Sequence, residues 1–313
     1  MEPQKIQVIY ITGTGRSGST LLETTLAQVP GVFSIGELVY LANVDVINQL
    51  CGCGQRFTAC SFWNTIEYDG AIGIQNLPVE VLGDLQRKVE GNRLLFLKLC
   101  RHPAAMRDNQ AKYIRMLEKL YEAIQLKSDC QIIVDSSKDI RRLSILQQLE
   151  NIDLVVVHLI RDPRAVAYAW TKTRRKPEIT DQVRLMDRYH PMRTAWRWLY
   201  KNLYLAATRK HYSGYVQVFY EDLADSPRQT LQTILKRVGL GKAPLNFLNE
   251  SHLEMRNDVH SISGNPMRFM EGEVTIVKDE QWQKQMPLFQ KMIVSGLTWP
   301  LMLLFRLQRG IRH

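Results

Sequence analysis

The sequence lacks several features that would place the chain in other classes. The apolar run nearest in length to a membrane span, Met292 to Phe305, contains Pro300 and falls short of about 18 residues, so we expect no spanning helix. The first residues, MEPQKIQVIY, show no basic segment followed by an apolar one, so we predict no secretory signal and a cytoplasmic protein. With no internal repeat, low-complexity tract or convincing linker, residues 1–313 are interpreted as one domain.

Cysteine is scarce, and the count of 5 is odd. Cys51, Cys53 and Cys60 lie close together, whereas Cys100 and Cys130 stand alone. A secreted disulfide framework is not expected in a chain this long. The three clustered thiols could form part of a zinc site, but no fourth ligand follows at the spacing of a zinc finger. We therefore assign no metal ligands and interpret the three as reduced structural cysteines in a surface insertion.

Acidic residues are outnumbered, because 41 Lys and Arg face 31 Asp and Glu, for a net charge of +10. This sign is compatible with an anionic ligand, nucleic acid or an anionic membrane surface. No helix-turn-helix, RRM or zinc-finger pattern accompanies the charge, so we predict no nucleic-acid partner. The basic excess is better explained by an anionic nucleotide.

Apolar runs separated by helix-compatible sequence indicate an α/β fold. Residues 6–12 (IQVIYIT) predict a strand, which is followed by a glycine-rich turn and by a predicted helix, TLLETTLAQV. Further predicted strands cover residues 94–99, 131–134, 154–159 and 215–219. Near-continuous apolar strands alternating with helices are typical of a parallel sheet with helices on both faces.

Two segments fall outside this alternation. Residues 170–195 include a polar and basic stretch without strand signals, which is typical of an excursion on the substrate side. Residues 290–313 combine an apolar stretch with Arg306, Arg309 and Arg312. A core helix followed by a solvated tail is the simpler interpretation of this C-terminal segment, and a peripheral membrane contact is the alternative.

The turn after the first strand predicts a phosphate-binding loop. Its sequence, from Gly13 to Thr20, is GTGRSGST. Glycines let backbone N–H groups approach an anion, and the start of the following helix adds partial positive charge. A Walker loop would need lysine where Ser19 stands. Arg16 is the cation of this loop instead, which suits a terminal group that bears one negative charge and is itself transferred.

The segment GTGRSGSTLLETTLAQVPGVFSIGEL resembles the 5'-phosphosulfate loop of sulfotransferases that use 3'-phosphoadenosine 5'-phosphosulfate (PAPS), especially the bacterial, carbohydrate and tyrosylprotein branches. The resemblance implies a P-loop-type parallel sheet and transfer of a sulfuryl group from PAPS to an acceptor hydroxyl. It also implies 3'-phosphoadenosine 5'-phosphate (PAP) as the product and no metal requirement. The implied donor contacts within the loop are Gly15, Arg16, Ser17, Gly18, Ser19 and Thr20.

A second segment, VVVHLIRDPRAVAYAW, is similar to the 3'-phosphate segment of that family. The resemblance implies that Arg161 grips the 3'-phosphate, in the bidentate manner open to a guanidinium. Eight residues later the family usually has a serine, and this sequence has Ala169. We expect the missing hydrogen bond to be supplied by Thr171, Thr173 or Arg174.

Three shorter matches extend the resemblance over most of the chain. FYEDLADSP places Tyr220 near the nucleotide, and HSISGNPMRF resembles a C-terminal loop that closes over PAPS and supplies Arg268. CGCGQRFTACSFW resembles an insertion common in bacterial relatives.

Sulfuryl transfer is an in-line displacement, so it needs a base and cations that stabilise the leaving group. The family resemblance makes Glu37 the general base, although a carboxylate there could instead begin a helix. Arg16 would stabilise the bridging and sulfuryl oxygens. Lys138 follows an apolar strand and would add a second cation, with Ser136 or Ser137 donating beside it.

Other interpretations stay open. Asp135 could hold magnesium in a P-loop kinase, and Ala169 could mark a degenerate nucleotide-binding protein without activity. His190 is a weaker alternative base, whereas His158 interrupts a strand and His102 precedes Pro103 in a loop. The acceptor could be a small molecule, a carbohydrate or a lipid, because specificity lies in loops outside these motifs.

Overall fold

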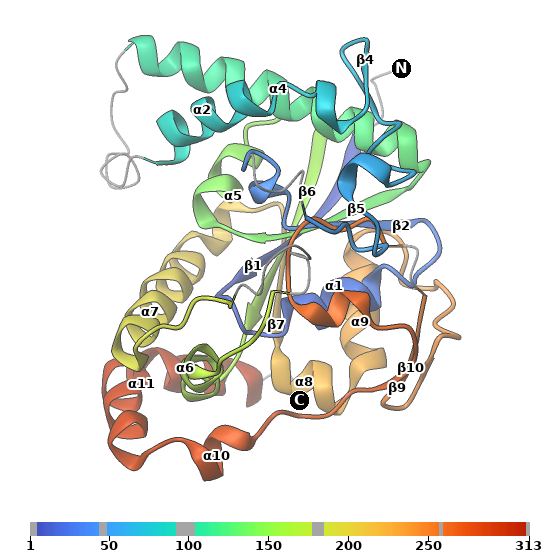
Figure 1. Cartoon of the computed structure of the whole chain (residues 1–313). Coiled ribbons are helices and arrows are strands. Elements are labelled where there is room, and N and C mark those ends of the chain that lie inside the picture. The colour runs from blue at the N-terminus through green and yellow to red at the C-terminus, as the bar shows by residue number, and fades with distance from the viewer. Residues whose placement is uncertain (1–4, 44–48, 92–103, 177–184, 257–258, 311–313) are drawn as a thin grey trace.

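The computed structural model describes residues 5–43, 49–91, 104–176, 185–256 and 259–310. Its centre is a parallel sheet of five strands in the order β2-β5-β1-β6-β7 (Figure 1). These strands are β1 Ile6–Gly13, β2 Val32–Gly36, β5 Ile132–Lys138, β6 Ile152–Ile160 and β7 Gly214–Phe219. All four neighbouring pairs are parallel.

Helices cover both faces of this sheet because apolar side chains leave each strand on both sides. In β1, Val8 and Tyr10 join one core cluster, and Ile9 and Ile11 join the other. The first core packs against α2 (Val79–Glu90), α4 (Ala104–Ser128) and α5 (Ile140–Leu146). The second packs against α1 (Ser19–Leu26), α8 (Tyr220–Asp225) and α9 (Pro227–Arg237). The predicted α/β fold is therefore confirmed.

Smaller elements extend these layers. A three-stranded antiparallel sheet contains β8 (Leu248–Asn249), β9 (His252–Met255) and β10 (Gly272–Thr275). A hairpin, β3 (Glu67–Tyr68) and β4 (Ala71–Ile72), follows the cysteine-rich insertion. Short 3-10 turns cover Leu38–Tyr40 (η1), Phe57–Ala59 (η3), Ile74–Asn76 (η4), Arg209–His211 (η5) and Pro266–Phe269 (η6).

A further layer is formed by α6 (Pro163–Thr171), α7 (Pro191–Thr208), α10 (Gln281–Gln285) and α11 (Leu288–Gly310). Helix α11 packs against α6 and α7 (Figure 1). Its buried side chains Leu301 and Phe305 join a cluster with Trp198 of α7. This packing offsets the cost of Pro300 in the helix interior, which is about 3 kcal/mol in an isolated helix.

Helix α11 runs from Leu288 to Gly310 and therefore extends beyond both ends of the apolar run from Met292 to Phe305. By length and composition alone, Leu288–Arg309 could cross a membrane, and 22% of its most apolar stretch is buried in the structure. The expectation of no spanning helix was based on the shorter apolar run, which is bounded by the charged residues Lys291 and Arg306.

Four of the five predicted strands correspond to β1, β5, β6 and β7. The fifth, residues 94–99, lies outside the described residues. Strand β2 was not predicted, because VFSIG is short and contains serine and glycine. Its position beside β5 matters for the site, since Glu37 follows its last residue.

Parallel strands end at one edge of the sheet, and the predicted site residues follow those ends. Glu37 follows β2, Lys138 ends β5, Arg161 follows β6 and Tyr220 follows β7. Arg16 lies three residues beyond the end of β1. The topology therefore gathers residues that are far apart in the sequence.

Candidate functional site

The loop between β1 and α1 leaves no room for side chains at two glycines. An added Cβ would lie 2.8 Å from the Trp170 ring at Gly15 and 2.6 Å from the Tyr220 ring at Gly18. Gly18 also has a φ of 92°, which glycine adopts without strain. The loop thus holds backbone close to two aromatic rings at the N-terminal end of α1, where an anion is favoured.

A cavity of about 790 Å³ opens at this edge of the sheet. Five of the six predicted loop residues line it, namely Gly15, Arg16, Gly18, Ser19 and Thr20. Ser17 is not among the lining residues, and its hydroxyl oxygen lies 2.8 Å from the hydroxyl oxygen of Thr14. Ser17 therefore contacts Thr14 within the loop, on the side that does not face the cavity.

Arg16 is half-buried against the wall of the cavity. Its guanidinium lies 4.9 Å from the centre of the Trp170 ring, and Nη2 donates to Met186 Sδ at 2.9 Å. Nε has no hydrogen-bond partner among the described residues. Burial lowers the pKa of Arg16, and the nearby Arg174 lowers it further. An anion brought into the cavity would relieve both effects.

Glu37 and Lys138 form an ion pair in the cavity wall. Glu37 Oε1 lies 2.8 Å from Lys138 Nζ, and the two side chains are 12% and 11% exposed. Their backbones follow neighbouring strands, since β2 pairs with β5. Glu37 also precedes the 3-10 turn η1, but its side chain makes no capping hydrogen bond there. The carboxylate is therefore directed to Lys138, and the helix-start interpretation of Glu37 is not supported.

The remaining polar residues of β5 are occupied by buried partners. Asp135 is fully enclosed, and Tyr121 donates to its Oδ2 at 2.6 Å while the Ser137 backbone donates to its Oδ1 at 2.8 Å. Ser136 donates to the buried carboxylate of Glu23. Burial raises the pKa of Asp135, and that residue does not line the cavity. Asp135 is thus poorly placed to hold the magnesium ion of a kinase.

Arg161 lines the cavity with its guanidinium 4.2 Å from the centre of the Tyr220 ring. Nη1 donates to the Arg16 carbonyl oxygen at 3.0 Å, and Nη2 donates to Asp279 Oδ2 at 3.1 Å. Nε is buried without a hydrogen-bond partner among the described residues. The guanidinium therefore holds a carboxylate in this structure, in the way a phosphate would be held.

Only one of the three residues expected to compensate for Ala169 faces the cavity. Ala169 and Arg174 both line it. The Thr171 hydroxyl donates to the Tyr168 carbonyl at 2.8 Å, and Thr173 is exposed. Arg174 is therefore the candidate that the geometry supports.

Arg268 lies behind the loop that it was expected to serve. Its Nη1 donates to the Ser261 carbonyl at 2.7 Å and its Nη2 to the Leu50 carbonyl at 2.9 Å. The side chain is 2% exposed and does not line the cavity. The same loop reaches the cavity through other residues, namely Ser263, Gly264, Asn265 and Met267. The structure thus corrects the expected orientation of Arg268, whose two backbone contacts draw it away from the nucleotide edge.

Sequence reasoning missed Lys201 and Asp279, which both line the cavity. Lys201 extends from α7 and donates to the Lys138 carbonyl at 3.0 Å. Burial lowers the pKa of Lys201 to about 8. A polar residue on the inward face of an amphipathic helix was the only available signal for Lys201. Asp279 carried no signal.

No histidine in the described part of the chain lines this cavity. His158 is buried, with Nδ1 2.6 Å from the Tyr215 hydroxyl and Nε2 2.8 Å from Asn202 Oδ1, and burial lowers its pKa to about 4. His190 is exposed at the start of α7, where its Nδ1 accepts from the Met192 backbone. Since it does not line the cavity, the alternative base is not supported. His102 lies outside the described residues.

Among the described residues, the side chains that line the cavity are positively charged overall. Its eight cationic side chains are Arg16, Lys138, Arg141, Arg161, Arg174, Lys176, Arg197 and Lys201. Its four carboxylates are Glu37, Asp139, Asp187 and Asp279. Eight against four leaves an excess of four positive charges, which favours an anionic ligand.

Comparisons with known proteins identify the family and the fold of this chain. A family model described as "Sulfotransferase domain" matches residues 7–294. The sulfotransferase domain of the olefin synthase from Synechococcus PCC 7002 is 21% identical and has a TM-score of 0.51, covering 95% of both chains. The sulfotransferase domain of the curacin biosynthetic pathway is 17% identical with a TM-score of 0.50, covering 95% of this chain and 98% of that one. No curated protein sequence matched the chain.

Proposed function

Because the chain belongs to the sulfotransferase family, we propose that it transfers a sulfuryl group from PAPS to an acceptor hydroxyl. The observation that carries this proposal is the placement of Arg16, Glu37 and Lys138 around one cavity at the carboxyl edge of the sheet. A base and two cations at one point are the groups that an in-line displacement needs.

The described residues fit a donor with phosphate groups at two positions. The β1–α1 loop approaches Trp170 and Tyr220 too closely for side chains at Gly15 and Gly18, so backbone itself forms this wall. On the other side, Arg161 has a buried Nε that lacks a partner among the described residues. The loop would hold the 5'-phosphosulfate and Arg161 the 3'-phosphate, and the donor supplies the group that is transferred.

Glu37 is the proposed base. Its carboxylate faces the cavity and can accept the proton of an acceptor hydroxyl. Lys138 holds that carboxylate in place and adds a positive charge beside it. Arg16 contributes a second cation from the loop, so charge that builds on the leaving group meets two positive side chains.

We further propose that the acceptor is polar, rich in hydroxyls and negatively charged, as an acidic carbohydrate is. The cavity lining also includes the amides Asn43, Gln49 and Gln86. Arg141, Arg197 and Lys201 add positive charge to the lining. Amides suit hydroxyl groups and the cations suit a carboxylate or a phosphate.

No observation of this kind supports the two alternatives, a P-loop kinase and a binding-only protein. A kinase would need a metal-binding carboxylate at the end of β5, and Asp135 is enclosed by Tyr121 and Ser137. A binding-only protein has no need of an ion-paired carboxylate beside the phosphate loop. The Glu37–Lys138 pair therefore favours catalysis.

The proposed activity is tested by measuring PAP release from PAPS with a panel of acceptors: acidic glycans, neutral glycans, glycolipids and phenols. We expect release above the acceptor-free rate, largest with acidic glycans. Tight PAP binding without release in the presence of any acceptor would instead support the binding-only alternative.

We also propose that the chain is a cytoplasmic protein that touches membranes peripherally through α11. The exposed apolar side chains of this helix include Phe289, Met292, Trp299, Leu303 and Leu307. The exposed Arg306 lies beside Leu307, and a cation flanking apolar and aromatic groups suits an anionic lipid surface.

Deleting residues 290–313 would be a poor test of this contact, because Leu301 and Phe305 belong to the core. The double variant Phe289→Ser, Leu303→Ser changes only exposed positions. In flotation with vesicles containing anionic lipid, the wild type should rise with the vesicles and the variant should remain below. Equal behaviour of the two proteins would contradict the contact.

A further inference from the structure

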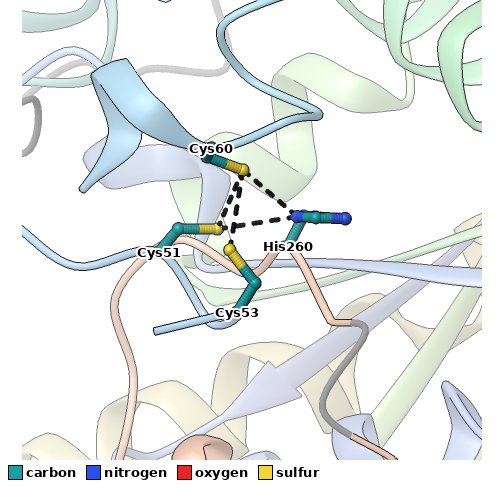
Figure 2. Close-up of side chains that lie close together, drawn as sticks. All are labelled: Cys51, Cys53, Cys60 and His260. Atoms are coloured by element: carbon teal, nitrogen blue, oxygen red, sulfur yellow. Dashed lines mark hydrogen bonds between the residues drawn. The ribbon is translucent and has the colours of Figure 1, made fainter. Parts of the chain in front are cut away.

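Four side chains of the kind that bind metals meet behind the loop that lines the cavity. The sulfurs of Cys51, Cys53 and Cys60 and the Nδ1 atom of His260 point toward one another (Figure 2). All four atoms lie within 4.8 Å of one another. His260 lies 200 residues beyond Cys60, which is why the sequence offered no fourth ligand at close spacing.

Four of the six distances between these ligand atoms lie close to those around one tetrahedral ion. Cys60 Sγ lies 3.6 Å from Cys51 Sγ, 3.7 Å from Cys53 Sγ and 3.2 Å from His260 Nδ1. Cys51 Sγ lies 3.9 Å from the same nitrogen. Zinc–sulfur bonds of about 2.3 Å and zinc–nitrogen bonds of about 2.0 Å place tetrahedral ligands about 3.5 to 3.8 Å apart.

The backbone around the cluster is arranged tightly enough to hold these positions. Gly52 has no room for a Cβ, which would lie 2.5 Å from the Val259 carbonyl oxygen and 2.5 Å from Ser261 Oγ. Its N–H donates to the Ser261 carbonyl at 3.0 Å. The His260 ring stacks on Phe62, with ring centres 5.3 Å apart. The insertion and the distant segment therefore approach each other closely at the cluster.

A disulfide explains less of this geometry. It would join two of the three sulfurs. The position of the third sulfur, and that of the His260 ring nitrogen beside the sulfurs, would remain unexplained. A single ion of a metal that prefers thiolate and imidazole ligands uses all four atoms.

We propose that Cys51, Cys53, Cys60 and His260 bind one zinc ion that joins the cysteine-rich insertion to the segment from Val259 to Arg268. Four protein ligands complete a tetrahedral site and leave no open position, so the ion is structural. None of the four residues lines the cavity, and the ion has no part in the transfer reaction. The proposal therefore does not depend on the proposed function.

The position of the cluster gives the ion a defined effect. Two residues after His260, the Ile262 carbonyl accepts from the Glu37 backbone N–H at 2.7 Å, and the Ile262 N–H donates to the Ile35 carbonyl at 2.9 Å. The Asn265 N–H donates to Thr20 Oγ1 at 3.3 Å. Fixing His260 thus steadies a segment that contacts both the end of β2 and the start of α1.

The direct test is the metal content of the full chain, purified without a metal-affinity step under reducing conditions. We expect about one zinc per chain by mass spectrometry. Replacement by cobalt should give the intense visible bands of a tetrahedral ion and a near-ultraviolet thiolate charge-transfer band. Absence of metal from folded protein would overturn the proposal, as would a disulfide within the cluster in protein purified without a reductant.

Variants separate this site from a general effect on folding. His260→Ala should lose at least about nine-tenths of the bound zinc and the cobalt charge-transfer band. Cys130→Ser changes the buried cysteine that lies outside the cluster and should keep both. In case His260→Ala fails to fold, the wild type itself is measured: a chelator should lower its melting temperature and added zinc should restore it. An unchanged melting temperature in zinc-free protein would contradict a structural ion.

Discussion

The two sides of the segment from Val259 to Arg268 have opposite electrostatic needs. On one side, Ser263, Gly264 and Asn265 line a cavity whose described wall contains eight cations and four carboxylates. On the other side, His260 meets three cysteine sulfurs. We propose that an anion completes the first arrangement and that a zinc ion completes the second. In these proposals the anion enters and leaves while the metal ion stays, so one segment would combine a permanent support with an exchangeable ligand.

The largest expected effect separates chemistry from binding on the cavity side. Glu37→Gln removes the proposed base and keeps a side chain of the same shape, so kcat should fall by a factor of about 100 or more while PAP affinity changes little. Steady-state kinetics and a PAP titration measure the two quantities. Glu254→Gln, which changes an exposed residue of β9, is the control. Near wild-type kcat in Glu37→Gln would remove Glu37 as the base.

Arg161 should account for recognition of the 3'-phosphate. A hydrogen bond to a charged group contributes about 1.5 to 3 kcal/mol, so Arg161→Ala should weaken PAP binding about 10- to 100-fold. Binding of AMP, which lacks the 3'-phosphate, should change far less. Arg164→Ala, whose guanidinium pairs with Asp162 at 2.6 Å outside the cavity wall, is a matched control. Equal losses for PAP and AMP would assign Arg161 a structural role instead.

Removing the charge of Asp279 should strengthen PAP binding, whereas the two preceding substitutions reduce turnover or binding. Its carboxylate lies 3.1 Å from Arg161 Nη2, where it competes with an incoming phosphate. Asp279→Asn should therefore tighten PAP binding, by about 2- to 5-fold for a partly exposed ion pair. Calorimetry of the variant with PAP and with AMP checks this. Weaker PAP binding would mean that Asp279 helps to hold the nucleotide.

The smallest expected effect is a change in how the stability of the protein depends on pH, and it comes from the cavity residue Lys201. The pKa of Lys201 is lowered by burial from 10.5 to about 8, so the folded state holds this proton less firmly than the unfolded state does. Its contribution to stability therefore rises as pH increases from about 8 toward 10.5. Since Lys201 lines a cavity that water enters, we expect the change in unfolding free energy with pH to be only a fraction of what the full pKa shift would give.

Chemical denaturation of Lys201→Met and wild type across this pH range measures that contribution. The unfolding free energy of the wild type should rise relative to that of the variant as pH increases. Lys210→Met alters an exposed lysine and should run parallel to the wild type. A difference between Lys201→Met and wild type that does not change with pH would contradict the lowered pKa.

The parts of the site that follow directly from strand ends could be predicted from the sequence. The β1–α1 loop, Lys138 and Arg161 adjoin apolar runs, and a parallel sheet brings such positions to one edge. Glu37 was identified by its resemblance to the family. Strand β2, which precedes it, was not predicted, because VFSIG has too few apolar residues to indicate a strand.

The residues that could not be predicted depend on contacts between distant segments. Asp279 meets Arg161 across 118 positions of sequence, and His260 meets Cys60 across 200. No local period or spacing encodes such a meeting. Arg268 was assigned to the right loop but to the wrong side of it, because two backbone carbonyls attract its guanidinium away from the cavity.

The central claim is that the cavity binds a nucleotide with phosphates at both the 3' and 5' positions. A thermal-shift titration with PAP alone, compared with ATP plus magnesium, tests it most directly. A ligand at 100 times its Kd adds about 2.7 kcal/mol to the free energy of unfolding. We expect PAP to raise the melting temperature without metal. Stabilisation by ATP plus magnesium alone would contradict it.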